Sequence, residues 1–450
     1  MNVNTVFHRA LVLLAAALLA GPALGQKAFV DVGKQPPITI VTPSAPWYPA
    51  FEKTVDLYEQ QTGNKVKLDV TPFVGILEKM RNAVRSGQSP YDLLMINSPN
   101  TVEFYEGGFL TPLKQIDPSF DVPKEVFSYG DSGYWNAQKR WRTANGGQLM
   151  AYTPLGNVQL LHYRGDVFKQ AGIAPPKTWQ DVLAACTKLS DPPKMYGFVA
   201  RGERGNGIRY DWHSVLMAEG GDVARNAEAG DFTVIINSPQ AKNALDLYIE
   251  LMKKCAPPNY GSLGQGDVIQ LLSTGKAAMA DVVVAATASF DDPAKSTVVG
   301  KVDTVPLPAG RNGGHGAAIG NWNTAVPKNL PDAQKKAALA FSRWFLSYEA
   351  QRAFAENGGI PNRSDVYTSD LAKQPRFRWF PAYLETQKFA AQDLGYAEGS
   401  QIDQILGLHL NQALIGEMSS GKALNTAARE IEELFRKNGR KTGMLPPLPE

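Results

Sequence analysis

The sequence has few of the side chains that metal sites and covalent catalysis use most often. Its 450 residues include two cysteines and five histidines. His8 lies close to the first residue, and the other four histidines stand alone, without the spacing of metal ligands: His162, His213, His315 and His409. The sequence therefore gives no support for a metal site, and we expect no metal, no cofactor and no catalytic residue.

The sequence also lacks a strong excess of charge of one sign. Its formal net charge is +3, and its lysines and arginines are scattered rather than clustered. A nucleic-acid-binding protein usually carries a concentrated basic patch or stripe. We therefore expect no nucleic-acid partner.

Long hydrophobic runs are absent beyond the first part of the chain. Arg9 precedes an unbroken apolar run, residues 10–20, which is followed by helix breakers and by small residues up to Gly25. This pattern is typical of a secretory signal peptide, residues 1–25, with Gln26 as the first mature residue. The alternative is a membrane anchor, but the run is shorter than the roughly 20 residues that span a bilayer. No cysteine follows the cleavage site to carry a lipid, so we expect release into the periplasm.

The two cysteines, Cys186 and Cys255, each lie on the apolar face of an expected helix. In an oxidising compartment such an even pair can form a disulfide, and the alternative is two separate buried thiols. The sequence leaves both possibilities open, and the role is structural in either case.

The first part of the mature chain alternates strands and helices. Strands are expected at 38–41, 65–70 and 92–96, and the helices between them end at Gly63 and Gly87. This alternation predicts a parallel sheet with helices on both sides, in which ligands bind at the carboxyl ends of the strands. These ends are expected at Thr42–Tyr48 and Asn97–Asn100. Because 450 residues exceed what one core usually supports, we expect two domains.

Further elements follow along the chain. Thr178 is an expected N-cap with Asp181 at the third helical position, and Ser238 and Pro239 begin another helix. Strands are expected at 160–163 and 275–284, a short helix from residue 165, and an amphipathic helix over 424–435. The proline-rich end, residues 441–450, is expected to be a flexible tail.

Several phrases closely resemble the extracellular solute-binding proteins of ABC importers, in the branch that binds maltose and multiple sugars. One phrase, at residues 163–179, combines a tyrosine, an aspartate and a phenylalanine with AlaGly, ProPro and ThrTrp. A second is GlyLysAlaAlaMet at 275–279. The other similar segments are 299–310, 320–328, 347–354 and 358–363. The resemblance covers nearly the whole mature chain. It implies an α/β, two-lobed periplasmic-binding-protein fold of type II, with a mainly parallel sheet flanked by helices in each lobe.

The resemblance also implies how the chain divides between the lobes. The N-terminal lobe is expected to comprise residues 36–155 and 303–357, and the C-terminal lobe residues 156–302 and 358–440. A hinge of three crossings is expected near Leu155–Asn157, Asp303–Val305 and Asn357–Ile360.

Aromatic residues lie repeatedly beside turn residues, outside apolar runs. Trp47 and Tyr48 stand between two prolines, Trp212 lies in a polar context, and Trp322 is flanked by Asn321 and Asn323. Sugars offer apolar ring faces and many hydroxyls, which suit aromatic platforms bordered by amides, carboxylates and arginine. A surface or domain-packing role for each tryptophan is the alternative.

The resemblance also implies which residues of this chain contact the ligand. It implies a polar contact at Asn157, a sugar contact at Trp322, and further contacts from the loop after the third strand and after GlyLysAlaAlaMet. The ligand-binding residues that we expect are Trp47, Tyr48, Asn97, Ser98, Asn157, Trp212, Asp281, Trp322, Asn323 and Arg363. A tryptophan common in the family near Asp281 is missing here, so the sequence does not identify the sugar.

These features together predict a periplasmic substrate-binding subunit of an ABC importer. It would bind a sugar or polyol between its lobes as a monomer and deliver it to the permease subunits in the inner membrane. The alternative is a secreted carbohydrate-active enzyme resembling a glycosidase, which would share the aromatic platforms but require a pair of catalytic carboxyl groups.

Overall fold

The computed structural model describes residues 29–391 and 394–450. The expected signal peptide and its cleavage point at Gln26 lie outside these ranges. Among the described residues, no helix combines the length and the hydrophobicity that a membrane crossing requires.

The first lobe is built on a five-stranded sheet. Its strands, in spatial order, are β2 (Val66–Thr71), β1 (Ile38–Pro43), β3 (Leu93–Asn97), β13 (Trp322–Ala325) and β6 (Ala151–Leu155). β1 pairs in parallel with both β2 and β3, which confirms the parallel pairing predicted for this part of the chain. β13 enters late and pairs antiparallel with β3 and β6. Its first residue therefore lies at the carboxyl end of β3, where Trp322 is opposite Asn97.

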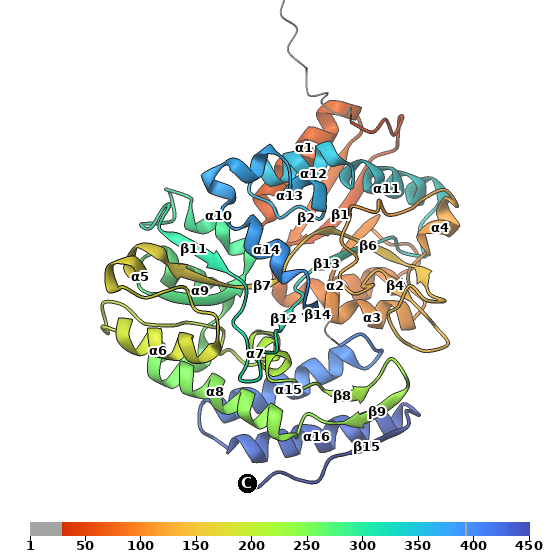
Figure 1. Cartoon of the computed structure of the whole chain (residues 1–450). Helices are drawn as coiled ribbons and strands as arrows, with labels where there is room; N and C mark the ends of the chain where they lie inside the picture. The colour runs from red at the N-terminus through yellow and green to blue at the C-terminus, as the bar shows by residue number, and fades with distance from the viewer. Residues whose placement is uncertain (1–28, 392–393) are drawn as a thin grey trace, which may run out of the picture.

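Helices cover the first sheet. They are α1 (Tyr48–Thr62), α2 (Phe73–Arg85), α3 (Ser98–Glu106), α4 (Leu113–Ile116), α11 (Asp332–Phe345), α12 (Tyr348–Glu356) and α13 (Ser364–Tyr367). As predicted, α1 ends at Gly63, which adopts the left-handed conformation that glycine favours, with φ 66°. Helices α1, α11 and α12 gather at one end of the molecule, far from α8 and α16 at the other (Figure 1).

The second lobe contains a smaller sheet of β10 (Met279–Val283), β7 (Gln159–Arg164) and β11 (Val302–Val305). Both neighbours of β7 run antiparallel to it, so the expectation of a mainly parallel sheet in this lobe is wrong. The sequence pattern marks each strand but carries no signal for its direction, because β10 and β11 lie far along the chain from β7 and pair with it only in the folded lobe.

The remaining helices belong to the second lobe. They are α5 (Gly165–Ala171), α6 (Trp179–Leu189), α7 (Asn206–Ala218), α8 (Pro239–Cys255), α9 (Gln265–Ser273), α10 (Thr287–Phe290), α14 (Phe380–Thr386), α15 (Gly399–Leu414) and α16 (Ser420–Lys437). Thr178 and Asp181 form the predicted capping box of α6, and Ser238 caps α8. Cys186 on α6 and Cys255 on α8 are joined by a disulfide, with their Cα atoms 5.9 Å apart.

The end of the chain is docked rather than flexible. Three short strands form a sheet: β8 (Ala224–Asn226), β9 (Asp231–Val234) and β15 (Thr442–Met444). β15 pairs in parallel with β9, and the side chain of Asn425 exchanges two hydrogen bonds, of 2.8 and 2.9 Å, with the backbone of Leu448. The prediction of a flexible tail over 441–450 is therefore wrong, because β15 and the backbone of Leu448 bond this segment to β9 and α16. The remaining strands form two short pairs away from the chain end. β4 (Tyr134–Trp135) pairs with β5 (Gln148–Leu149), and β12 (Ala317–Ala318) pairs with β14 (Ala390–Ala391).

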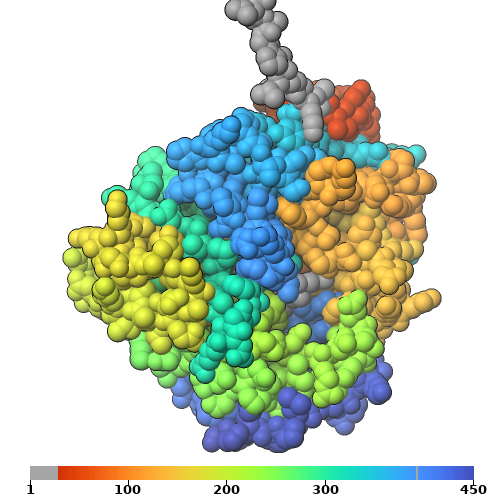
Figure 2. Space-filling view, in the orientation of Figure 1, coloured from red at the N-terminus to blue at the C-terminus, as the bar shows by residue number. Residues whose placement is uncertain are grey.

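The chain passes between the two main sheets at three places. The first passage lies between β6 and β7, where it was predicted. The second comes later than Asp303–Val305, because β11 still belongs to the second sheet and the chain returns only with β13. The third comes after Ile360, whose carbonyl accepts a 3.1 Å hydrogen bond from Gly156, the residue that follows β6. It comes before α14, which packs against β7 and β11. Figure 2 shows the blue segment around α14 over the middle of the visible face, between the orange and yellow parts of the chain.

Candidate functional site

A small pocket lies where the two lobes meet at the carboxyl ends of the first sheet. We call it the interlobe pocket; its volume is about 150 Å³. Its lining residues are Phe73, Val74, Ile76, Leu77, Met80, Asn97, Asn100 and Trp322 from the first lobe and Asn206, Asp403 and Gln404 from the second. The hydroxyl of Ser400 in the second lobe donates a 3.0 Å hydrogen bond to the amide oxygen of Asn100, so the lobes touch directly at this point. The edge formed by the carboxyl ends of strands is where α/β sheets usually bind ligands.

Aromatic rings form one wall of the interlobe pocket. The indole of Trp322 makes edge contacts with Trp47 and Phe73, with ring centroids 6.4 and 5.9 Å apart. Trp47 is completely buried and also contacts Phe51 at 5.9 Å, so it supports Trp322 from behind without lining the pocket. Of the tryptophans expected at the ligand, Trp322 alone is among the residues that line this pocket.

The sequence interpretation missed Phe73 and Val74, which form the apolar rim. They follow β2 directly and are exposed to 48% and 88%, unusually high values for large apolar side chains. Gly75 has a φ of 100°, which a residue with a side chain rarely adopts and which turns the chain sharply here. The signal was present in the sequence as two apolar residues between Pro72 and Gly75 at the end of a strand.

Amides and one carboxylate form the polar wall. Asn97 is the last residue of β3 and Asn100 lies in the first turn of α3, and Asn97 was a predicted contact. Asp403 on α15 accepts hydrogen bonds on Oδ1 from Asn206 Nδ2 at 3.1 Å and from Arg209 Nε at 2.5 Å. These second-lobe residues were not predicted, because α7 and α15 are separated by almost 200 residues and meet only through packing.

Ser98 and Asn323 serve the interior of the first lobe. The hydroxyl of Ser98 accepts a 2.9 Å hydrogen bond from the buried guanidinium of Arg142. Asn323 points to the opposite face of β13 from Trp322, and its amide oxygen accepts hydrogen bonds from Ser132 and Thr153 at 3.0 and 2.8 Å. Both side chains are satisfied by the protein, so neither faces the interlobe pocket.

Three other predicted residues also lie outside the interlobe pocket. Trp212 is completely buried within α7. The hydroxyl of Tyr48 donates to Glu52 at 2.7 Å at the start of α1, and burial followed by this hydrogen bond raises the pKa of Tyr48 above its usual value. Arg363 binds the carboxylate of Asp365 and the carbonyl of Leu346 within the first lobe, at 2.7 and 3.0 Å.

Asn157 lies at the first passage between the lobes. Its side-chain amide donates to the carbonyl of Gly320 at 3.2 Å, and the backbone N–H of Gly320 donates back to the carbonyl of Asn157 at 2.7 Å. Asn157 therefore ties the first passage to the second and does not line the interlobe pocket.

Asp281 belongs to a buried polar cluster in the second lobe. Its Oδ1 accepts a 3.1 Å hydrogen bond from Gln159, which also bonds to Asp211, and Asp211 is ion-paired with Arg201. Burial, followed by repulsion from Asp211, raises the pKa of Asp281 well above its usual value. The carboxyl group of Asp281 is completely buried in this cluster and does not face the interlobe pocket.

The chemistry of the interlobe pocket suits binding. A glycosidase places two carboxyl groups on either side of the scissile bond, whereas Asp403 is the one carboxyl group among the residues that line this pocket. In the described ranges no group of three or more histidine, cysteine, aspartate or glutamate side chains could hold a metal ion. The pocket therefore offers an aromatic face, amides and one carboxylate, which suit hydroxyl groups on an apolar carbon frame.

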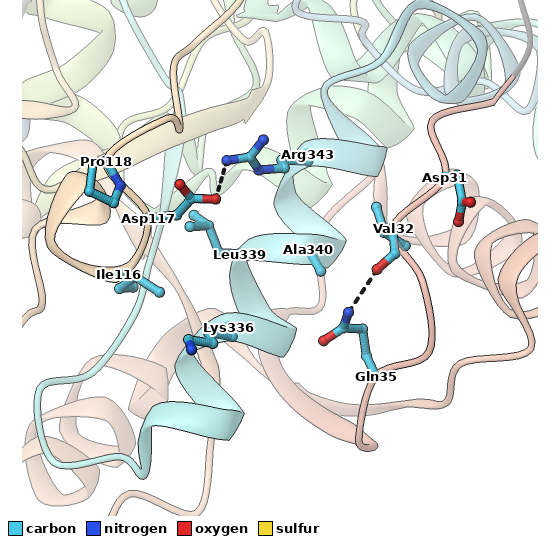
Figure 3. A pocket seen from close by; sticks show the side chains of 10 residues that line it. All are labelled: Asp31, Val32, Gln35, Ile116, Asp117, Pro118, Lys336, Leu339, Ala340 and Arg343. Carbon is cyan, nitrogen blue, oxygen red and sulfur yellow. Dashed lines mark hydrogen bonds and ion pairs between the residues drawn. The ribbon is translucent and has the colours of Figure 1, made fainter.

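A larger hollow of about 560 Å³ lies elsewhere on the first lobe (Figure 3). It lies between the segment 31–35, the end of α4 and α11, and Figure 3 shows Asp117 paired with Arg343 within it. All its lining residues belong to the first lobe, so this hollow does not lie between the lobes. We place the functional site at the smaller interlobe pocket for that reason.

Known proteins resemble this chain over most of its length. A family model described as bacterial extracellular solute-binding protein matches residues 41–352. A probable ABC transporter-binding protein of Deinococcus radiodurans is 26% identical over 403 residues, covering 86% of this chain and 90% of the relative. A mannitol-binding protein of Pseudomonas aeruginosa is 23% identical over 451 residues, covering 95% of this chain and 98% of the relative.

Solved structures share the fold. An ABC transporter solute-binding protein from Agrobacterium radiobacter K84, in complex with ribitol, superposes with a TM-score of 0.76 at 24% identity. The superposition covers 91% of this chain and all of the Agrobacterium chain. The predicted fold, that of a type II periplasmic binding protein, is thereby confirmed.

Proposed function

Because this chain belongs to the bacterial extracellular solute-binding proteins, we propose that it captures a small sugar or polyol in the interlobe pocket and delivers it to the permease of an ABC importer. The observation that carries this proposal is the composition of the pocket, with the indole of Trp322 on one wall and amides and a carboxylate on the other. An aromatic ring packs on the carbon frame of a sugar or polyol, while amides and carboxylates hydrogen-bond its hydroxyl groups.

The size of the interlobe pocket favours a small ligand. Its volume of about 150 Å³ is well below the roughly 300–1,000 Å³ of pockets for drug-sized molecules. The relatives that bind mannitol and ribitol support a ligand of this size. We propose an acyclic polyol or a monosaccharide rather than an oligosaccharide.

The mechanism that we propose is closure of the two lobes around the ligand. The lining residues come from both lobes, so a ligand that touches Trp322 and Asp403 together stabilises the closed arrangement over an open one. Only this difference in affinity can drive the closure. The passages at Leu155–Gln159, between β11 and β13, and between Ile360 and α14 would form the hinge.

The cellular setting of the proposal follows from the first residues of the sequence. We propose that residues 1–25 are removed and that the protein works in the periplasm as a monomer, with the inner-membrane permease as its partner. Peptide mass mapping of periplasmic extract should find an amino terminus at Gln26.

The experiment that tests the proposed function combines binding with a search for turnover. Purified protein is titrated with ribitol, mannitol, glucose and maltose by calorimetry and thermal shift, and the ligand is then recovered and analysed. We expect a rise in melting temperature with an unchanged ligand. A hydrolysed or modified product would contradict the proposal and favour the secreted enzyme.

A further inference from the structure

The interlobe pocket has a distinctive distribution of charge. Among its lining side chains are four amides and one carboxylate, that of Asp403, and no lysine or arginine. Arg209 lies behind Asp403, where it is completely buried and donates from Nε to Asp403 Oδ1 at 2.5 Å. Its guanidinium also lies over the ring of Tyr210, 5.4 Å from the centroid. The guanidinium is thus buried on the protein side of this ion pair, and Asp403 is the member of the pair that lines the pocket.

Asp403 lies close to the amino-terminal end of α7. The amino-terminal end of a helix attracts anions, because its first N–H groups lack partners within the helix and its dipole is positive there. Asn206 is the first residue of α7, and its side chain donates to Asp403 Oδ1 at 3.1 Å. The carboxylate of Asp403 is therefore held beside the first turn of α7, through the side chain of Asn206.

We propose that Asp403 is a specificity-determining residue that excludes phosphorylated ligands from the interlobe pocket. A phosphate group entering beside Asp403 would meet a like charge with no cation in the lining to offset it, whereas a hydroxyl group can donate to the amides or to the carboxylate. The site therefore selects neutral polyols or sugars over their phosphate esters. This inference rests on the proposed function and adds that the ligand carries no phosphate charge.

The direct test compares each neutral ligand with its own phosphate ester on the full mature chain. Calorimetric titrations would use mannitol against mannitol 1-phosphate, glucose against glucose 6-phosphate, and glycerol against glycerol 3-phosphate. We expect the ester of the best neutral ligand to bind at least tenfold more weakly. Equal or tighter binding of the ester overturns the inference and leaves the proposed function standing. Binding of neither kind overturns the proposed function itself.

Substitutions then locate the discrimination. Asp403→Asn removes the charge but keeps an oxygen that can accept from Arg209, and it should raise the affinity for the ester relative to the neutral ligand at least tenfold. Glu417→Gln is the matched control, because it removes one negative charge from an exposed residue just after α15 and should leave the ratio unchanged. An unchanged ratio in Asp403→Asn overturns the inference.

A second variant covers the case in which Asp403→Asn fails to fold. Gln404→Lys adds a cation to the pocket lining at an exposed position and leaves the pair between Asp403 and Arg209 intact. We expect the affinity for the ester to rise at least tenfold relative to the affinity for the neutral ligand in this variant as well. An ester that gains nothing from this lysine would show that charge at this wall does not set the selectivity, which overturns the inference.

Discussion

Trp322 is the residue at which the stacking proposal can be tested most directly. Its indole lines the interlobe pocket and is held by edge contacts with Trp47 and Phe73. We expect Trp322→Ala to weaken ligand binding about tenfold to a hundredfold, or about 1–3 kcal/mol, as is usual for a desolvated aromatic anchor. Calorimetry at a temperature well below the melting point of each variant measures this loss.

The stability of the same variant needs a separate control, because Trp322 is only 5% exposed and also packs within its own lobe. Trp322→Phe keeps an aromatic face with a smaller ring, so it should retain most of the stability and an intermediate affinity. Wild-type affinity in Trp322→Ala would show that the ring is a packing residue only. Phe73, exposed at the rim, would then be the next aromatic residue to test.

Asp281 predicts a dependence of stability on pH. Its pKa in the folded protein is raised well above the value of about 3.9 expected for an unfolded chain, first by burial and then by Asp211. As the pH rises above about 4, the unfolded chain loses this proton first, so the folded state binds more protons and the free energy of unfolding falls. The fall continues until the pH passes the raised pKa.

The side chain of the variant Asp281→Asn cannot ionise. The variant should therefore lose the part of the fall in unfolding free energy that comes from this carboxyl group, which is at most about 1.4 kcal/mol per pH unit for one proton. Urea unfolding at several pH values between about 4 and 8 measures the slope. Asp191→Asn, at an exposed position of the same lobe, is the control and should follow the wild type. Parallel pH curves for Asp281→Asn and the wild type would refute this account of the cluster.

At the scale of elements, the disulfide between α6 and α8 is expected to stabilise the second lobe. Cys186 and Cys255 are 69 residues apart, and closing a loop of that length removes about 4 kcal/mol of chain entropy from the unfolded state in the simplest model. A reductant should therefore lower the melting temperature of the wild type. The double variant Cys186→Ala, Cys255→Ala should melt lower from the start and not respond to the reductant. Two free thiols in unreduced protein would contradict the bond.

The elements that sequence reasoning predicted well are those with local signals. Gly63 ends α1, the capping box of Thr178 and Asp181 begins α6, and β1 and β3 appear as short apolar runs. The signals that failed are those that depend on distant partners. The antiparallel direction of β10 and the docking of β15 on β9 depend on contacts that no local pattern encodes.

The same distinction divides the candidate site. Asn97 and Trp322 were predicted because strand ends and the family phrases mark them, and both line the interlobe pocket. Asn206 and Asp403 were missed because α7 and α15 come together only in the folded second lobe. Asn323 is adjacent to Trp322 in sequence but points to the opposite face of its strand, which adjacency in the sequence alone does not indicate.

At the scale of the whole molecule, the proposed function requires that the lobes move. In the structure they touch beside the interlobe pocket, where the hydroxyl of Ser400 donates to Asn100. The pocket draws lining residues from both lobes, and a ligand that contacts both favours closure over any arrangement in which they separate. The three connecting passages each join the lobes by a single stretch of chain, which permits rotation of one lobe against the other.

We therefore expect the protein without ligand to be more extended in solution than with saturating ligand. Small-angle X-ray scattering should show a smaller radius of gyration on addition of the polyol or sugar that calorimetry identifies. The control is Trp322→Ala at the same ligand concentration, chosen above the dissociation constant of the wild type and below that of the variant, which should stay extended. The variant should close once enough ligand is added, because its hinge is intact. A radius that is the same with and without ligand in the wild type, at concentrations where calorimetry shows full binding, would mean that the ligand enters a pocket already closed, and lobe motion would not be the signal that the permease receives.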